Sequence, residues 1–358
     1  MEIFMTGANG FVGLNIAAAL LKRQHGVTAY VREGSDTTHL ERLGGVRIVR
    51  GSLDHPRAVE TAMCGAQAVI HTAGNTSCNR RDLPALLEAN VRATQHIVDA
   101  AVVNGVSRIV YTSTTSTIGS TGQAARPADE DTPLTGFRAR SPYARTKQQA
   151  EQIVRAGMER GVECIILNPA EVIGPFDHSL QWGRMVLAVY HDQVPFVPPG
   201  GGSFCSATEV GRAHVTALTR GRSGERYILG GENASYATFL ETIAQVLGRS
   251  CRLPRTPYAW LYTKALLQDT LPAVASVLVP GKPAVEPYRM RVFAGTHYFD
   301  SSKAQRELGY GCPTLRQMLR ECAGWYRRHG YFGVPARQPL STPQPTPHEA
   351  RPAWIQER

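Results

Sequence analysis

The chain has 358 residues, 42% of them hydrophobic and 19% charged, which is typical of a globular protein and argues against a disordered or fibrous chain. Its net charge of +10 comes from 39 Lys and Arg against 29 Asp and Glu, but the basic residues are spread over predicted helices without a dense run, so we expect no nucleic-acid partner. The seven cysteines are scattered and form no Cys-x-x-Cys pair, which predicts reduced thiols, no metal site and a cytoplasmic location.

The chain begins with a strand, a glycine-rich turn and a helix. Residues 2–5 form a short apolar strand that Met1 directly precedes, so we expect no signal peptide. The sequence Thr-Gly-Ala-Asn-Gly-Phe-Val-Gly follows at 6–13, and apolar residues with helical spacing run over 11–21. This order would place backbone N–H groups and a helix N-terminus in front of the diphosphate of a bound dinucleotide. A plain loop without a ligand can carry the same glycines. The predicted dinucleotide contacts here are Gly7, Asn9, Gly10, Phe11, Val12 and Gly13.

Strand-like and helix-like segments alternate through the first half of the chain. The strand-like segments are short, rich in β-branched or aromatic residues, and bounded by glycine or polar turns, at 27–31, 47–49, 68–71, 108–111 and 164–167. Helical segments lie between them at 57–63, 83–104 and 141–160. Repeated β-α units predict an α/β fold, namely a Rossmann-type doubly wound parallel sheet with its sites at the carboxyl ends of the strands.

The second half of the chain has a different pattern. Prolines and aromatics become frequent after residue 175, which predicts a smaller C-terminal substrate-binding lobe over 176–332, while 1–175 form the NAD(P)-binding domain and segments near 203–222 return to it. Further helices are expected at 209–219 and 236–247, with a strand at 226–229. The apolar stretch 260–279 is broken by charges and Pro272, which favours a buried or interface helix pair over a membrane span. The proline-rich tail 335–358 is predicted to be disordered.

Two side chains on the helix predicted at 141–160 have the spacing of an acid–base pair. Tyr143 and Lys147 are four residues apart and therefore share one face, while Ser141 and Pro142 suit the N-cap and the first helical position. A free tyrosine has a pKa near ~10, and a neighbouring lysine together with a bound nicotinamide cation would lower it. Tyrosine and lysine also occur at this spacing by chance, so the context decides. The strand at 108–111 ends in six hydroxyl residues, 112–117, which either bind a substrate carbonyl or satisfy their own turn.

Taken together, these residues resemble the extended short-chain dehydrogenase/reductase family over residues 1–330. The turn at 6–13 matches the family pattern TGxxGxxG, and the Tyr143–Lys147 pair completes the set. His-Thr-Ala-Gly at 71–74, Asn-Val-Arg-Ala-Thr at 90–94, Asn-Pro at 168–169 and Tyr-Phe-Asp-Ser-Ser-Lys at 298–303 stand where the family has its remaining motifs. The active-site hydroxyl falls at Ser113 or Thr114, of which Thr114 is the better match.

The resemblance implies a role for each of these residues. Tyr143 would donate or accept the proton on the reacting oxygen, Thr114 (or Ser113) would orient that oxygen, and Lys147 would hold the nicotinamide ribose. Asn90 would support a water or backbone link behind Lys147. Family members often dimerise through helices equivalent to 90–103 and 143–160, which predicts a homodimer. The further cofactor contacts implied are Leu53, Asp54, Thr72, Ala73, Gly74, Thr112, Tyr143, Lys147, Asn168 and Pro169.

The cofactor and substrate are less strongly indicated. The second strand ends in Val31-Arg32 without the acidic residue of NAD-preferring sites, so we expect NADP(H), with NAD(H) possible, unless Arg32 is only a solvated loop residue. Glu171 stands where sugar-nucleotide enzymes of the family usually have asparagine, and 200–209 lack their arginine. This favours a dihydroflavonol 4-reductase-like ketone or aldehyde reductase over a nucleotide-sugar epimerase or dehydratase. A silent dinucleotide sensor is the third alternative. Aromatic residues in 176–196 and 258–293 suit an apolar or aromatic substrate, or simply the core.

Overall fold

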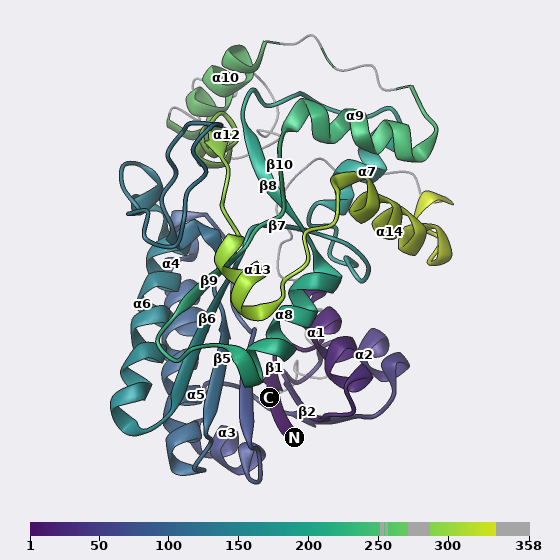
Figure 1. Cartoon of the computed structure of the whole chain (residues 1–358). Helices are drawn as coiled ribbons and strands as arrows, with labels where there is room; N and C mark the ends of the chain where they lie inside the picture. The colour runs from purple at the N-terminus through teal and green to yellow at the C-terminus, as the bar shows by residue number, and fades with distance from the viewer. Residues whose placement is uncertain (251–253, 255–256, 271–286, 334–358) are drawn as a thin grey trace, which may run out of the picture.

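The computed structural model describes residues 1–250, 254, 257–270 and 287–333. Its main sheet is parallel throughout, with the strand order β3-β2-β1-β4-β5-β6-β9, which confirms the predicted Rossmann-type fold (Figure 1). The order reverses between β1 and β4, and ligands of such sheets bind beyond the carboxyl ends of the strands at this point. The strands are β1 (Glu2–Thr6), β2 (Gly26–Val31), β3 (Val46–Arg50), β4 (Ala68–His71), β5 (Arg108–Thr112), β6 (Glu163–Pro169) and β9 (Arg226–Leu229).

Both faces of this sheet are buried under helices, as its apolar strands require. In β1, Ile3 and Met5 face one cluster, which includes α1 (Phe11–Lys22) and α8 (Ala207–Arg220), whereas Phe4 faces the other. The second cluster lies under α3 (Pro56–Met63), α5 (Ala93–Val103) and α6 (Pro142–Ala156) (Figure 1). The short helix α2 (Thr38–Leu43) contributes Leu40 to the α1 side.

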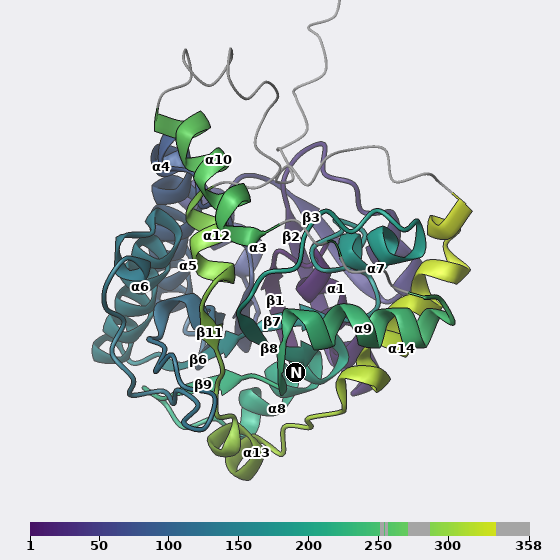
Figure 2. The same cartoon turned by 90° about the horizontal axis from the view of Figure 1, so that it is seen from above.

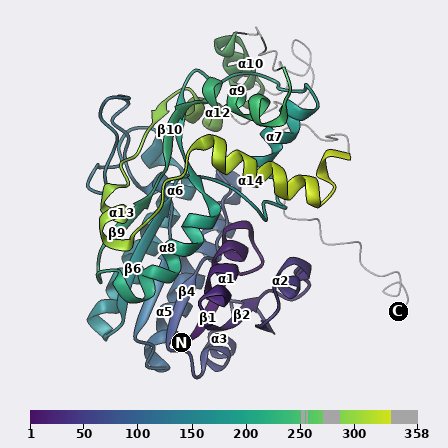
Figure 3. The ribbon, with the colours of Figure 1, turned by 45° about the vertical axis from the view of Figure 1, so that its right-hand side comes forward.

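A second, four-stranded sheet stands beyond the carboxyl ends of the first and was not predicted. In it β8 (Gly201–Ser206) pairs with β7 (Glu171–Ile173), β10 (Glu232–Ser235) and β11 (Thr296–His297), of which only β10 is antiparallel. Three helices pack an apolar cluster onto it, namely α7 (Gly183–Tyr190), α9 (Tyr236–Leu247) and α14 (Leu315–Arg328) (Figures 2 and 3). Only Ala170 separates β6 from β7, so one continuous segment passes from the first sheet to the second.

Several predicted elements differ in detail from the structure. The helix expected at 83–104 is α4 (Leu83–Leu86), a π-helix (Leu87–Arg92) and then α5. The helix expected at 141–160 is α6 with its predicted N-cap, Ser141, and a terminal 3-10 turn (Gly157–Arg160). The first part of the stretch 260–279 belongs to α10 (Tyr258–Thr270), and 271–279 lie outside the described residues, as does the tail 335–358. The remaining elements are α12 (Pro287–Phe293), α13 (Ser302–Leu308) and 3-10 turns at Arg80–Asp82, Thr115–Thr117, Arg138–Arg140 and Tyr331–Gly333.

Two further findings bear on the predicted partners. Among the described residues, no helix has the length and apolar character needed to cross a membrane. Ile97, Val98 and Val154 lie on the helices through which a homodimer is predicted, but their side chains point from α5 and α6 into the core. The sheet face needs these side chains, so they supply no interface, and the homodimer stays a prediction.

Candidate active site

The glycine-rich turn after β1 is as tight as its sequence predicts. Gly7 has φ +68°, and a Cβ there would lie 2.6 Å from the backbone nitrogen of Ala73, in the turn after β4. A Cβ at Gly13 would lie 2.0 Å from the Gly7 carbonyl oxygen, so only glycine allows this contact between helix and turn. Gly10 is the N-cap of α1 and its carbonyl accepts from the Leu14 amide at 2.8 Å. The turn therefore presents the start of α1, with Phe11 and Val12, at the switch point of the sheet.

The loops after β2 and β3 lie beside this turn. The Asn9 amide donates to the Asp36 carbonyl at 3.2 Å, which ties the turn to the loop 32–37. Arg32 is exposed at the start of that loop. After β3, Asp54 receives a hydrogen bond from Ser52 at 2.9 Å, and the Leu53 carbonyl contacts the His96 ring at 2.7 Å. These positions suit the adenosine half of a dinucleotide, with Arg32 free to reach a 2′-phosphate.

The ends of β4 and β5 are joined by hydroxyl groups. The Thr72 and Thr112 hydroxyls lie 2.9 Å apart, and Thr112 also contacts Nε2 of His214 at 2.8 Å. The amide of Ala73 donates to the Thr6 hydroxyl at 3.2 Å. His214 comes from α8, so this helix supports the strand ends directly. Burial lowers the pKa of His214 to about 4, which keeps its ring neutral at physiological pH.

Asn90 holds the turn after β4 against α6. Its Oδ1 accepts from the Asn75 amide at 2.7 Å, and its Nδ2 donates to the Asn75 carbonyl at 2.9 Å and to the Thr146 hydroxyl at 3.1 Å. A Cβ at Gly74 would lie 3.0 Å from the same Oδ1 and 4.0 Å from Nζ of Lys147. Asn90 sits in the π-helix at Leu87–Arg92. It therefore fixes the loop beside Lys147 through backbone contacts, without bonding to Lys147 itself.

Lys147 reaches the end of β5 from α6. Its ammonium donates to the Thr112 carbonyl at 2.8 Å and lies 4.2 Å from the centre of the Tyr111 ring. Burial lowers the pKa of Lys147 to about 7, and the Glu151 carboxylate opposes this change. The lysine is thus held at the switch point, where the resemblance places the nicotinamide ribose.

Tyr143 lies on α6, and Thr114 lies in the turn after β5. Burial raises the pKa of the Tyr143 phenol above its ordinary value, whereas the Thr114 hydroxyl and the charge of Arg289 oppose this. From the sequence, Lys147 is expected to lower this pKa, but the groups that lower it here are Thr114 and Arg289. At neutral pH the phenol therefore keeps its proton and is a donor.

Ser113 belongs to a different network, below the strand ends. Its hydroxyl donates to Glu151, whose carboxylate also accepts from Thr117 at 2.8 Å and from the Asn168 amide at 3.0 Å. The other carboxylate oxygen of Glu151 pairs with Arg226 of β9 at 2.6 Å. The Thr114 hydroxyl accepts from the Ser116 amide at 3.1 Å, and of the two hydroxyls it is the one that acts on the pKa of Tyr143. Sequence reasoning missed Glu151, although it follows Tyr143 and Lys147 at the same four-residue spacing.

Asn168 and the buried Pro169 end β6 against this network. The Asn168 amide also donates to the Thr114 carbonyl at 3.0 Å, so it fixes the loop that carries the Thr114 hydroxyl. Three residues after Asn168, Glu171 accepts from the Trp182 indole at 2.7 Å. Burial raises the pKa of Glu171 to about 7, against the charges of Arg138 and Arg289. The structure therefore brings Tyr143, Lys147, Thr114, Asn90 and the glycine turn to one edge of the sheet.

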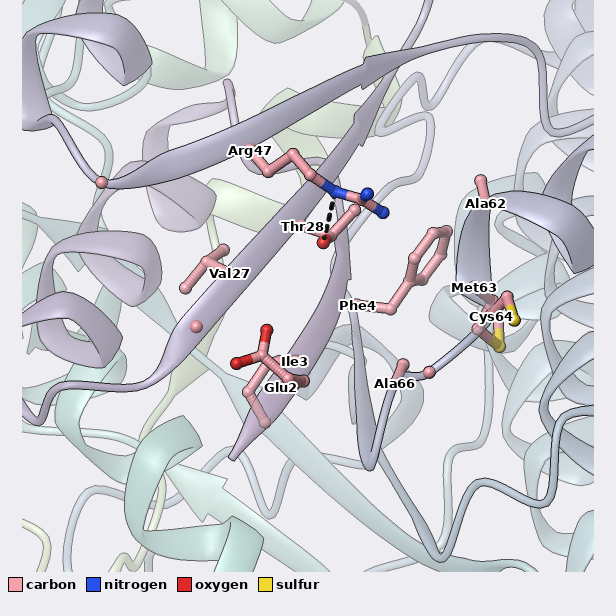
Figure 4. Close-up of a pocket in the computed structure, with 13 residues that line it drawn as sticks. Glu2, Ile3, Phe4, Val27, Thr28, Arg47, Ala62, Met63, Cys64 and Ala66 are labelled. Atoms are coloured by element: carbon pink, nitrogen blue, oxygen red, sulfur yellow. Dashed lines mark hydrogen bonds between the residues drawn. The ribbon is translucent and has the colours of Figure 1, made fainter.

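A pocket of about 440 Å³ lies at the opposite edge of the sheet. It is lined by Glu2, Phe4, Thr28, Arg47 and Cys64 among others, where β1 and β2 begin and α3 has just ended (Figure 4). Arg47 donates there to the Thr28 hydroxyl at 3.2 Å. Because sites of doubly wound sheets lie beyond the carboxyl ends of the strands, this pocket is not the active site.

Comparisons with known proteins agree with this geometry. The model of the NAD dependent epimerase/dehydratase family matches residues 3–230, which is more than half of the chain. A protein of Synechocystis with the provisional name dihydroflavonol 4-reductase is 31% identical and covers 92% of this chain and 95% of its own. A 2-alkyl-3-oxoalkanoate reductase of Stenotrophomonas maltophilia is 28% identical, covering 87% and 94%. The crystal structure of gox2253 has a TM-score of 0.79 at 30% identity, covering 92% and 98%.

The glycine turn, the α1 N-terminus and the Lys147 ammonium fit a dinucleotide at the switch point, because they offer the tight approach and the positive charge that a diphosphate and a ribose need. With the match of the family model and of the relatives, the chain belongs to the NAD dependent epimerase/dehydratase family of extended short-chain dehydrogenases/reductases, and it is an NAD(P)-dependent oxidoreductase.

Proposed function

We propose that the protein reduces a ketone or aldehyde to an alcohol with NADPH, and that Tyr143 donates the proton. The observation that carries this proposal is that Tyr143 and Lys147 share one face of α6 and that the Lys147 ammonium is fixed on the carbonyl of Thr112, two residues before Thr114. The hydroxyls of Tyr143 and Thr114 would hold a carbonyl oxygen there, and the protonated phenol is the form that a reduction requires. One relative is named 2-alkyl-3-oxoalkanoate reductase, which also supports a carbonyl substrate.

The residues of the chain share this work. The Thr114 hydroxyl orients the carbonyl oxygen, Tyr143 gives it a proton, and Lys147 holds the ribose from the end of β5. Asn90 and Asn168 are positioning residues, because they fix the loops that carry Gly74 and Thr114. The dinucleotide, when bound, supplies the hydride. The dinucleotide would be held by residues 1–175 together with 203–222, and the substrate mainly by residues 176–332. The protein would work as a homodimer in the cytoplasm.

The contacts proposed for NADP(H) begin at the glycine turn. There the backbone around Gly7, Asn9, Gly10, Phe11, Val12 and Gly13 would receive the diphosphate. Arg32 would bind the 2′-phosphate, since β2 ends in Val31 without a carboxylate that would repel it. The other proposed contacts are Leu53, Asp54, Thr72, Ala73, Gly74, Thr112, Tyr143, Lys147, Asn168 and Pro169.

An epimerase or dehydratase of nucleotide sugars remains the second candidate, because the family as a whole is named for both reactions. Glu171 argues against it. Its buried carboxylate stands where a substrate diphosphate would come, and such charges repel each other strongly once water is excluded. The third alternative, a silent dinucleotide sensor, has no use for a buried lysine and a tyrosine at the strand ends.

Two measurements test the proposal. Any dinucleotide retained on purification is released and quantified, and NADPH and NADH are then titrated on the emptied protein. An empty site that binds NADPH at least about tenfold more tightly supports a reductase that exchanges its cofactor at each turnover. A firmly retained NAD would support the epimerase, in which the same dinucleotide takes and returns the hydride.

The second measurement is the Tyr143→Phe variant. Its turnover is expected to fall by about 10²- to 10⁴-fold, as for the loss of a general acid, while the dissociation constant of NADPH stays within about threefold. Persisting turnover would show that another group donates the proton. Ser141→Ala, at the N-cap of the same helix, separates a loss of the phenol from a loss of helix stability.

A further inference from the structure

Buried polar groups without partners gather on the side of the site that faces the second sheet. Among the described residues, the buried side-chain atoms that lack a hydrogen-bond partner include Nη1 of Arg138, Nε of Arg289, the Tyr236 hydroxyl and Nδ1 of His297. Buried polar atoms in folded proteins are nearly always paired, so four such atoms in one region indicate groups that a ligand would satisfy. The two arginine nitrogens and the Tyr236 hydroxyl can each donate a hydrogen bond to an oxygen atom.

These residues come from separate elements but act on one another. Arg138 precedes α6, Arg289 lies on α12, Tyr236 opens α9 and His297 lies on β11. The charge of Arg138 acts on Tyr236, on His297 and on Glu171, whereas that of Arg289 acts on Glu171 and on Tyr143. The segments that carry the two arginines touch, since the ring centroids of Phe137 and Tyr288 lie 6.0 Å apart, and the charge of Arg289 acts on the reacting phenol.

Gly202 of the second sheet lies directly against this cluster. A Cβ at this position would lie 3.1 Å from Cγ of Glu171 and 3.5 Å from the Tyr236 hydroxyl, so glycine lets these two side chains pack closely onto the strand. His297 pairs with Gly202 in the sheet register. The Trp182 indole stacks on Tyr236, with ring centroids 5.9 Å apart.

The charges of the cluster do not balance. Among the described residues, two guanidinium groups, Arg138 and Arg289, act electrostatically on one carboxylate, that of Glu171, and burial raises the pKa of this carboxylate to about 7. A further arginine, Arg184, acts on Arg289, and the charge of Asp177 acts on Arg184 in turn. Burial lowers the pKa of His297 to about 4, so its ring adds no charge at neutral pH. Among the described residues of the cluster, positive charge therefore exceeds negative charge, and charges held away from water are normally paired.

We infer that Arg138 and Arg289 bind a carboxylate carried by the substrate, so that the protein acts on oxo acids and the corresponding hydroxy acids. This inference rests on the proposed function, since Tyr143 has to meet the carbonyl of the same molecule. A carboxylate accepts from two guanidinium groups and brings the one negative charge that the cluster lacks. A diphosphate would bring more negative charge than the cluster can pair and would face Glu171, so the geometry favours the carboxylate.

The experiment compares each acid with its uncharged ester. NADPH-dependent reduction of 3-, 4- and 5-oxodecanoate is measured beside that of their methyl esters, which keep the ketone and the chain. For at least one pair, kcat/KM is expected to be about 10- to 100-fold higher for the acid, because a charge-assisted hydrogen bond is lost in the ester. Equal rates for acid and ester in every pair that reacts would overturn the clamp while leaving the reductase in place.

Two variants assign the preference to the arginines. In Arg138→Gln and Arg289→Gln the ratio of acid to ester kcat/KM is expected to fall towards one, whereas Arg289→Lys, which keeps the charge, retains part of it. Arg140→Gln, at an exposed arginine of the same 3-10 turn, is the matched control and should keep the full ratio. If both Gln variants keep that ratio as well, other groups bind the acid and the proposal is wrong.

A binding measurement separates this inference from the proposed reaction. The Tyr143→Phe protein, loaded with NADPH, is titrated with the same acids and esters by calorimetry. Binding of an acid at least about tenfold more tightly than its ester, without turnover in the unchanged protein, would support the clamp and contradict the reductase. Absence of both binding and turnover for all six compounds would contradict both.

Discussion

The two edges of the active site are built on different principles. On the cofactor side, most of the polar side chains have partners within the chain: Asn90 bonds to Asn75 and Thr146, Lys147 to the Thr112 carbonyl, and Glu151 to four groups, although the Tyr111 hydroxyl and Oδ1 of Asn168 have none. On the substrate side, facing the second sheet, Arg138, Arg289 and Tyr236 keep buried atoms without partners. The first edge is therefore largely completed within the chain, whereas the proposal has a particular substrate complete the second. Variants on the two edges should therefore fail in different ways.

The largest effect on stability is expected at the completed edge. Glu151→Ala leaves Arg226 without its partner and removes the acceptor of Ser113, Thr117 and Asn168. Breaking a buried ion pair on one side costs about 3 to 5 kcal/mol, and we expect a loss in this range in urea unfolding. Glu159→Ala, at an exposed carboxylate just beyond the same helix, should cost under about 0.5 kcal/mol. Equal losses in the two variants would show that the network is not important for stability.

The buried lysine should make stability depend on pH. The pKa of Lys147 is lowered to about 7 in the folded chain, so between this value and its unfolded value the unfolded chain binds more protons. Stability of the emptied protein is therefore expected to rise with pH above 7, by a few kcal/mol up to about pH 10. Unfolding in denaturant at several pH values measures this, and Lys147→Met should remove the slope. Lys22→Met, at an exposed lysine of α1, should leave it as it is.

Arg32 tests the outer end of the cofactor edge. Arg32→Ala is expected to weaken NADPH binding by about 10-fold, because one charge-assisted pair with the 2′-phosphate is lost, and to leave NADH binding nearly the same. Fluorescence titration of both dinucleotides gives the ratio. The exposed Arg57 of α3 is the matched control. A parallel loss for NADH would mean that Arg32 contributes only general positive charge.

The smallest effect on stability is expected at the substrate edge of the site. Tyr236→Phe removes a buried hydroxyl that has no partner, so the protein should keep its stability or gain up to about 1 kcal/mol. Tyr227→Phe instead removes a hydroxyl that donates to Glu307 at 2.7 Å and accepts from the Arg222 amide at 3.1 Å, and it should lose about 1 kcal/mol. Thermal unfolding compares the two. A clear loss in Tyr236→Phe would mean that its hydroxyl is paired within the chain.

The sequence was informative where a single side chain or a regular spacing of apolar residues decides the local structure. The glycine turn depends on the positive φ of Gly7, and the helix start depends on Ser141 and Pro142, so both were predicted. The strands of the main sheet were predicted because β-branched runs between turns have few alternatives. These features belong to single segments, and no distant partner is needed to see them.

The second sheet could not be predicted in this way. Its strands β7 and β11 have three and two residues, and each is stabilised only by β8, a strand rich in glycine and serine. Short strands without alternation give no periodic signal. Arg138 and Arg289 were missed for a related reason, since they are far apart in the sequence, one in a 3-10 turn before α6 and the other on α12. The π-helix at Asn90 likewise follows from tertiary contacts and not from helix propensity.

The single residue between β6 and β7 limits how far Glu171 can lie from Asn168. Asn168 anchors the Thr114 loop and Glu171 stands in the substrate space, and three residues of extended chain span at most about 10 Å. The covalent chain therefore keeps Glu171 within this distance of Asn168, the residue that anchors the Thr114 loop. The segment that carries Glu171 cannot move away from the site. A change of substrate in this fold therefore requires another residue at position 171 or changes in the segments that face position 171.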